Sequence, residues 1–333
     1  MRKQTLITSI ILIIFSVTFY SCKKTKVSHP AIDTSIDNDS DTCSCGNLPA
    51  IPGYSTGYSY YHEPSYIVSP IFNPNNDNEI LFINFKSTSN KDLVKYNLIT
   101  KEKTILFTGS IFASPTWSKL DWIVFDNGYN GIYKVRPDGS ELTLFITGGD
   151  KFNPKFNDEG DKILTYHAFT APYQYAGKIW DINGQLLDSI DYDVNRDLDW
   201  KRQNNIAFRK NDEILIMNPM NKEVIKTHNT FLGEPGKYSS GFAWINEDEA
   251  ILGHGTDVKL LNVWTGNTTK LICGCQDRRY QNFSVNGDGT KAIFNKLIYK
   301  QIEEGNPLDI LVINKITLYN FITDEVIDLE IEL

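Results

Sequence analysis

The sequence predicts an all-β fold, a six-bladed β-propeller of four-stranded blades. Three observations lead there: a phrase that recurs six times from about residue 65 onward, a strand–turn–strand segment after each copy, and no helical periodicity after the N-terminal tract. The copies recur every 39 to 45 residues, which is the period of a propeller blade. A solenoid of this period would need helices, whereas radial blades protect their strand edges.

The recurring phrase is an apolar residue, a polar turn and a short β-branched or aromatic run, as in "SPIFNPNNDNEILFI" and "GFAWINEDEAILG". The residue before the turn aligns the six copies, and we call these six the alignment residues: Phe72, Trp117, Phe156, Trp200, Trp244 and Val285. Large apolar residues at a fixed repeat position normally fill core, so we expect them to pack blade on blade.

The second segment of each unit carries the chemistry of a tight hairpin. Pro137-Asp138-Gly139, Asn183-Gly184 and Thr265-Gly266-Asn267 occupy its middle in three copies. Gly and Asn accept the positive φ that such turns require. Each unit should therefore contribute four strands, and an alternative with a seventh blade would recruit residues 47–64.

The residues of the repeat also resemble a known family. "NPKFNDEGDKILTY" and "NGDGTKAIF", with "IYKVRPDGSELTLFITGG", resemble the WD-like repeat of TolB-like propellers over about 65–333, within an expected propeller domain 51–333. The resemblance implies a six-bladed propeller outside the cytoplasm that works through protein contacts. TolB carries a further α/β domain before its propeller, and this sequence has no counterpart, so TolB's own partners do not transfer.

The N-terminus has the three parts of an export signal. Arg2 and Lys3 precede an apolar stretch, Leu6 to Tyr20, that is too short to span a bilayer comfortably. The stretch ends in Ser21-Cys22, which resembles the bacterial lipobox, so residues 1–21 are expected to be a lipoprotein signal peptide and Cys22 the lipidated residue. Residues 22–50 read as a flexible tether. These features predict a lipid-anchored protein of the bacterial cell envelope, and we expect the outer membrane.

Four of the five cysteines form two C-x-C pairs, Cys43 with Cys45 and Cys273 with Cys275. The compartment favours oxidation, and a C-x-C pair closed on itself would be strained, so we expect disulfides between the two pairs. Which sulfur bonds which stays open. A tetrathiolate metal site is the alternative, although C-x-C spacing is tighter than in the usual structural zinc knuckle.

Catalytic signals are weak. Ser55 lies in "GYSTG", but that G-x-S-x-G motif requires an α/β domain that the repeat pattern excludes. The five histidines lack metal-ligand spacing. The sequence therefore predicts a non-enzymatic protein with no catalytic residue, metal or cofactor.

The predicted function is binding or scaffolding of an envelope protein or peptide by one propeller face. Candidate binding residues are Tyr173 and Tyr175, in the tyrosine-rich insertion 166–178, together with His167 and His254, which follow comparable inner-strand regions. The alternative is a carbohydrate-active propeller, either glycan-binding or a polysaccharide lyase with histidines around a central metal. A net charge of −8 and the absence of a basic patch argue against nucleic acid.

Overall fold

The computed structural model describes residues 59–332 except for 113–114, 149–150, 169–174, 191–197, 201–204, 211–212, 230–238, 255, 276 and 303–308. The chain divides into two compact units, Met1–Asn38 and Asp39–Leu333, and every described residue belongs to the second. The search for a helix long and apolar enough to cross a membrane found none among the described residues.

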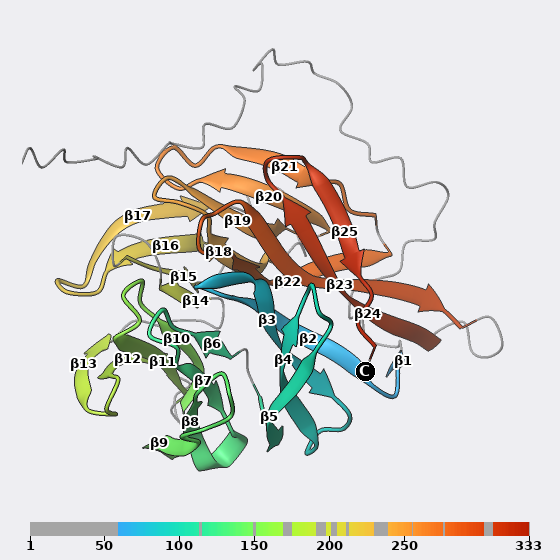
Figure 1. Cartoon of the computed structure of the whole chain (residues 1–333). Coiled ribbons are helices and arrows are strands. Elements are labelled where there is room, and N and C mark those ends of the chain that lie inside the picture. Colours follow the sequence, from blue (N-terminus) through green and yellow to red (C-terminus); the bar gives the residue numbers. More distant parts are fainter. Residues whose placement is uncertain are drawn as a thin grey trace, which may run out of the picture. The chain divides into compact units, whose positions relative to one another are not determined.

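The fold is a six-bladed β-propeller, as the repeat predicts. Each blade takes four antiparallel strands that follow one another in the chain, and their colours therefore run in sequence order from sheet to sheet in Figure 1. The strands of the first three blades are β2 (Tyr66–Asn73), β3 (Asn76–Phe85), β4 (Lys91–Asn97) and β5 (Lys103–Gly109); β6 (Thr116–Trp117), β7 (Ile123–Asp126), β8 (Gly131–Val135) and β9 (Thr143–Thr147); β10 (Lys151–Phe156), β11 (Lys162–Ala168), β12 (Tyr175–Asp181) and β13 (Leu186–Ile190).

The strands of the last three blades are β14 (Leu198–Trp200), β15 (Ile206–Lys210), β16 (Glu213–Asn218) and β17 (Glu223–Asn229); β18 (Ser239–Trp244), β19 (Glu249–His254), β20 (Asp257–Asn262) and β21 (Thr268–Ile272); β22 (Arg278–Val285), β23 (Lys291–Gln301), β24 (Asp309–Asn320) and β25 (Glu325–Leu329). A single 3₁₀ turn, η1 (Gly128–Asn130), precedes β8 among the described residues.

The first strands of the blades form the inside of the ring. Each contacts the first strand of the next blade, and β2 contacts β22, so the sixth blade closes on the first. The alignment residues end these strands and are all buried, which confirms their predicted role as core. Because the strands alternate in direction, the propeller has two faces. The hairpin face carries the first-to-second and third-to-fourth strand turns, and the loop face carries the other connections.

The N-terminal strand joins the last blade rather than forming a new one. β1 (Ser59–His62) pairs in parallel with the start of β24, where the β23–β24 hairpin extends at the loop face. The ring of Tyr60 packs edge-on against Tyr299 of β23. The alternative of a seventh blade built from 47–64 is therefore wrong, because the described part of that segment adds an edge strand to blade six.

Buried bulges recur near the start of the inner strands. The pairing of the first and second strands shifts register in four blades, and in each the residue three positions before the alignment residue has positive φ: Ser69, Asn153, Gly241 and Asn282. A bulge bends the strand and turns peptide groups out of the ladder, so those groups must find other partners. In blade one that partner is Asn295 of blade six.

Candidate functional site

The two predicted histidines lie at equivalent positions on the loop face. His167 and His254 lie at the ends of the second strands of blades three and five, His167 one residue before the end, and each is four residues beyond the residue that pairs with its alignment residue. Both side chains are buried. His167 Nε2 lies 3.3 Å from Thr165 Oγ1, and its ring stacks on Trp180 at 6.2 Å between centroids. The two histidines belong to different blades, and no described metal-ligating group of three or more side chains includes them.

Several predicted residues fall where the structure is not described. Cys22, Cys43, Cys45, Ser55 and Tyr173 lie outside the described residues. Tyr175 is the first residue of β12 and therefore stands at the loop face. Cys273 and Cys275 follow β21 at the same face, in the connection to β22. Among the residues that the structure describes, no group of three or more His, Cys, Asp or Glu could hold a metal ion.

A row of aromatic side chains crosses the loop-face end of blade one. Tyr66 of β2 pairs with Phe85 of β3, and Phe85 pairs with Lys91 of β4, so the three side chains are direct neighbours on one side of the sheet. The rings of Tyr66 and Phe85 stack at 4.6 Å, and His62 of β1 stacks on Tyr66 at 4.7 Å. Lys91 Nζ lies 4.7 Å from the Phe85 ring centroid on the next strand.

This row leads to an exposed ring that is held in place. Phe112, in the connection from blade one to blade two, has 55% of its surface exposed. Lys91 Nζ lies 5.0 Å from the centroid of this ring and donates a hydrogen bond to the carbonyl of Ile111. The Phe112 backbone N–H donates to Asp126 Oδ1 at 2.6 Å. A methyl group at Gly128 would lie 2.5 Å from the ring, so only glycine allows this packing.

The groups that hold Phe112 are themselves buried and charged. Lys91 is 7% exposed and Asp126 0% exposed. Burial lowers the pKa of Lys91, and the nearby Asp126 charge opposes that shift. Removing two charges from water costs several kcal/mol, which their attraction only partly offsets. Two buried charged side chains thus hold the backbone on either side of the exposed Phe112 ring, Lys91 at the Ile111 carbonyl and Asp126 at the Phe112 N–H.

Sequence reasoning missed this arrangement. Tyr66, Phe85, Lys91 and Phe112 become neighbours only through the strand register, and no spacing between them identifies a site. The one available signal was composition: two adjacent apolar residues, Ile111 and Phe112, in the connection between blades, of which the structure buries only Ile111.

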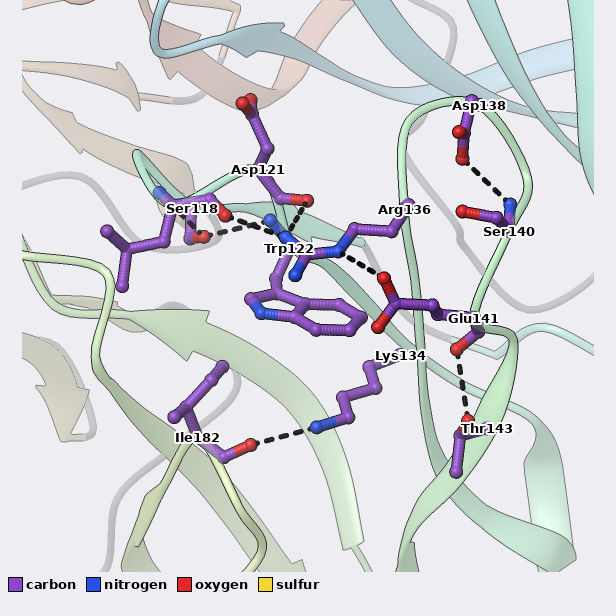
Figure 2. A network of polar contacts seen from close by, with 11 residues as sticks. Ser118, Asp121, Trp122, Lys134, Arg136, Asp138, Ser140, Glu141, Thr143 and Ile182 are labelled. Carbon is purple, nitrogen blue, oxygen red and sulfur yellow. Dashed lines mark hydrogen bonds and ion pairs between the residues drawn. The ribbon is translucent and has the colours of Figure 1, made fainter.

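A different cluster stands on the hairpin face of blade two. Trp122 precedes β7, and Lys134 and Arg136 reach its ring from β8 and the residue after it, as Figure 2 shows. The Arg136 guanidinium carbon lies 3.6 Å from the indole centroid and Lys134 Nζ 4.6 Å from it. Lys134 Nζ also donates to the carbonyl of Ile182 in blade three at 3.1 Å, so the cluster spans two blades.

Arg136 is held by three further contacts. Its Nη1 donates to the carbonyls of Leu120 at 3.0 Å and Asp121 at 3.3 Å, and its Nε lies 3.3 Å from Glu141 Oε1. These contacts keep the guanidinium over the indole, and the Arg136 side chain is 30% exposed. Such a preorganised arginine loses little entropy on binding a partner.

Comparisons with known proteins support the fold and go no further. No family model matches the chain, and no curated protein sequence matches it significantly. Among solved structures it is similar to TolB from Acinetobacter baumannii, with 10% identity, a TM-score of 0.52, and coverage of 79% of this chain and 62% of TolB. The chain thus spans less than two thirds of TolB.

Two further structures show the same likeness. An oligogalacturonate lyase in complex with manganese is 11% identical over 79% of this chain and 76% of the lyase, with a TM-score of 0.50. The β-propeller domain of the Trilobed protease from Pyrococcus furiosus, described as having an open velcro topology, is 10% identical over 81% and 100%, also at 0.50. At such identities the likeness shows the propeller fold alone.

Proposed function

We propose that this protein is a non-enzymatic, lipid-anchored envelope protein whose loop face binds a protein or peptide partner. The observation that carries the proposal is the exposed Phe112, held by the buried Lys91 and Asp126. Aromatic anchors that are rigid before binding dominate protein interfaces, because little conformational entropy remains to be lost.

The stacked row beside Phe112 favours a protein partner over a glycan. Sugars bind aromatic residues through open ring faces, whereas His62, Tyr66 and Phe85 stack face to face at 4.6 and 4.7 Å. The row therefore presents ring edges. Ring edges carry partial positive charge and suit backbone carbonyls and aromatic side chains of a polypeptide.

The rest of the loop face fits the same role. The predicted residues Tyr175, His167 and His254 stand at this face, in blades three and five. The extended β23–β24 hairpin and β1 also belong to it. In this proposal the lipid on Cys22 anchors the chain and residues 22–50 give the propeller its reach.

Disulfides complete the proposal. Cys273 and Cys275 are treated as disulfide-bonded, and the proposal assigns Cys43 and Cys45 as their partners. Cys273 and Cys275 lie at the loop face, and β1, which starts 14 residues after Cys45, pairs with blade six at that face. The two pairs would thus hold the N-terminal segment beside the blade that it completes.

The test is site-specific photo-crosslinking in intact cells of the native organism. A benzoylphenylalanine at position 112 should give one discrete protein adduct, and the same probe at Leu187, which is 47% exposed on an outer strand, should not. Adding Lys91→Met, which frees the ring without altering the probe, should reduce the yield.

Two results would overturn the proposal. One is equal adduct patterns from positions 112 and 187. The other is turnover by the purified mature protein of a polygalacturonate substrate with added Mn²⁺, detected as unsaturated uronate ends. That result would establish the lyase alternative.

A further inference from the structure

The internal repeat gives a standard against which each blade can be compared. One position can be compared in all six blades. The first core residue of each second strand pairs with a residue of the third strand, and the position compared is the next residue along that third strand. Five blades carry Asn or Asp there, and in each the side-chain Oδ1 accepts backbone N–H groups of the hairpin turn at 2.8 to 3.3 Å. These residues are Asn97, Asp181, Asn218, Asn262 and Asn320.

Blade two is the exception. Arg136 occupies the turn-capping position, and the turn is capped instead by Asp138 Oδ1, which accepts from Ser140 N at 2.8 Å. The connection 136–142 is longer than its five counterparts, 98–102, 182–185, 219–222, 263–267 and 321–324. Glu141 within it has φ +56, in addition to the regular positive-φ turn residue Gly139.

The residue that Arg136 covers is equally exceptional. Trp122 directly precedes the first core residue of β7, where the other blades have Glu79, Lys162, Asn205, Glu249 and Lys291. Two departures from the repeat therefore meet in one stacked pair. Positions at which a chain abandons its own local rule are where function is expected.

The surroundings of the pair indicate what would bind. Leu120, whose carbonyl accepts from Arg136, is 50% exposed, and Leu142 beside Glu141 is 45% exposed. The exposed residues Asp121, Asp138 and Glu141 lie on the same two turns: Asp121 accepts from Asn75, Asp138 caps its own turn, and Glu141 pairs with Arg136. An apolar and guanidinium centre with an acidic rim complements a basic segment that presents an aromatic side chain.

We infer that the Trp122–Arg136 pair is a second docking site, on the hairpin face, for a basic peptide segment with an aromatic anchor. The anchor would stack on the outer side of the guanidinium, and its flanking cations would lie beside the acidic turns that carry Asp121 and Asp138. Because this site and Phe112 lie on opposite faces, the protein would bridge two partners. The docking site itself does not depend on Phe112, whereas the bridging of two partners rests on the proposed loop-face function.

The test uses the full mature chain with Cys22→Ser, labelled with ¹⁵N at tryptophan. Six indole signals are expected, and Trp122→Phe assigns the one of interest. The tripeptide Lys-Trp-Lys should shift that signal in a saturable way, while Lys-Gly-Lys and Glu-Trp-Glu should not. Arg136→Lys, which keeps the charge and loses the flat stack, should weaken binding at least tenfold.

Arg136→Asn is the decisive variant, because it restores the residue of the other blades. It should abolish the shift and leave Tm unchanged within about 2 °C. A fall in Tm of more than about 5 °C would mean that the pair serves stability, and would overturn the inference. The absence of any Lys-Trp-Lys shift would also overturn the inference. An equal shift with Glu-Trp-Glu would overturn it too, because that result would indicate a site for anions. Phe112→Ser should leave all of these results unchanged.

Discussion

Asn295 of β23 and Ser69 of β2 are hydrogen bonded across the seam between the last and first blades, although 226 residues separate them. Asn295 Oδ1 accepts the Ser69 N–H at 2.7 Å, and its Nδ2 donates to the carbonyl of Ile67 at 3.0 Å. One fully buried amide thus satisfies both peptide groups that the blade-one bulge turns out of the ladder. The seam is closed by this contact, by the packing of β2 against β22, and by β1, the N-terminal strand that pairs with β24 at the edge of blade six.

The first prediction concerns this seam. Asn295→Ala should lower the free energy of unfolding by about 2–4 kcal/mol, because it leaves a buried N–H and a buried carbonyl unpaired. Urea unfolding followed by far-UV circular dichroism measures it. Asn221→Ala, in an exposed turn of blade four, is the matched control and should cost less than about 0.5 kcal/mol. An equal loss of unfolding free energy in both variants would contradict a stabilising role for the seam contact beyond that of an exposed turn residue.

The second prediction concerns the pair beneath Phe112. Lys91→Met should lower the free energy of unfolding by about 3–5 kcal/mol, because it leaves the Asp126 carboxylate buried without its cation. Lys91→Met with Asp126→Asn should be more stable than Lys91→Met alone, since both charges are then removed. A double-mutant cycle should give a coupling of at least about 1 kcal/mol. Additive losses would contradict the coupling of these two residues.

The third prediction concerns acid stability. His228 of β17 bonds through Nε2 to the carbonyl of Val263 in blade five, and burial lowers its pKa despite that bond, with Lys226 contributing in the same direction. The unfolded chain then binds more protons than the native one below about pH 6.5, so stability falls as pH falls through this range. His228→Gln should flatten that slope between about pH 6.5 and 5.

His62 needs its own control in that experiment. Burial lowers its pKa as well, so it adds to the slope in the same sense. His62→Gln measured alongside separates the two contributions. An unchanged slope in His228→Gln would assign the acid sensitivity elsewhere.

Much of the fold could be predicted because the sequence pattern of one blade occurs six times in the chain. The alignment residues end the inner strands, and Gly139, Gly184 and Gly266 have the positive φ that the turns require. Three other hairpins place Lys101, Lys222 and Asp324 in that conformation, where composition gives no such signal. The bulges were also missed, since they depend on how the inner strands meet around the ring.

The candidate sites were only partly predictable, for two different reasons. The Phe112 site depends on register across β2, β3 and β4, which a single sequence does not fix. The exceptional residue at position 136 could have been found from the sequence alone. Aligning the ends of the third strands shows Asn or Asp in five copies and Arg136 in the sixth, an exception that an alignment on the first strand does not reveal.

The fourth prediction concerns the anchor. If Cys22 is lipidated, Cys22→Ser should leave the chain uncleaved or release it into the soluble fraction. Fractionation and immunoblotting measure this, with Cys43→Ser as a control that should remain with the membrane. A mature-length Cys22→Ser protein in the membrane fraction would contradict lipidation at this residue.

The last prediction concerns the two C-x-C pairs. Loops of more than two hundred residues would be closed by bonds between Cys43 or Cys45 and Cys273 or Cys275. In the chain-entropy model such closure contributes on the order of 4–5 kcal/mol, less any strain. Intact-mass measurement of the mature protein should show a mass four hydrogens below the fully reduced chain, and no thiol that can be alkylated before reduction. Reduction should lower Tm, whereas EDTA should leave it unchanged. Four cysteines that react with iodoacetamide without reduction, or a bound metal that EDTA removes, would replace the disulfides with the tetrathiolate alternative.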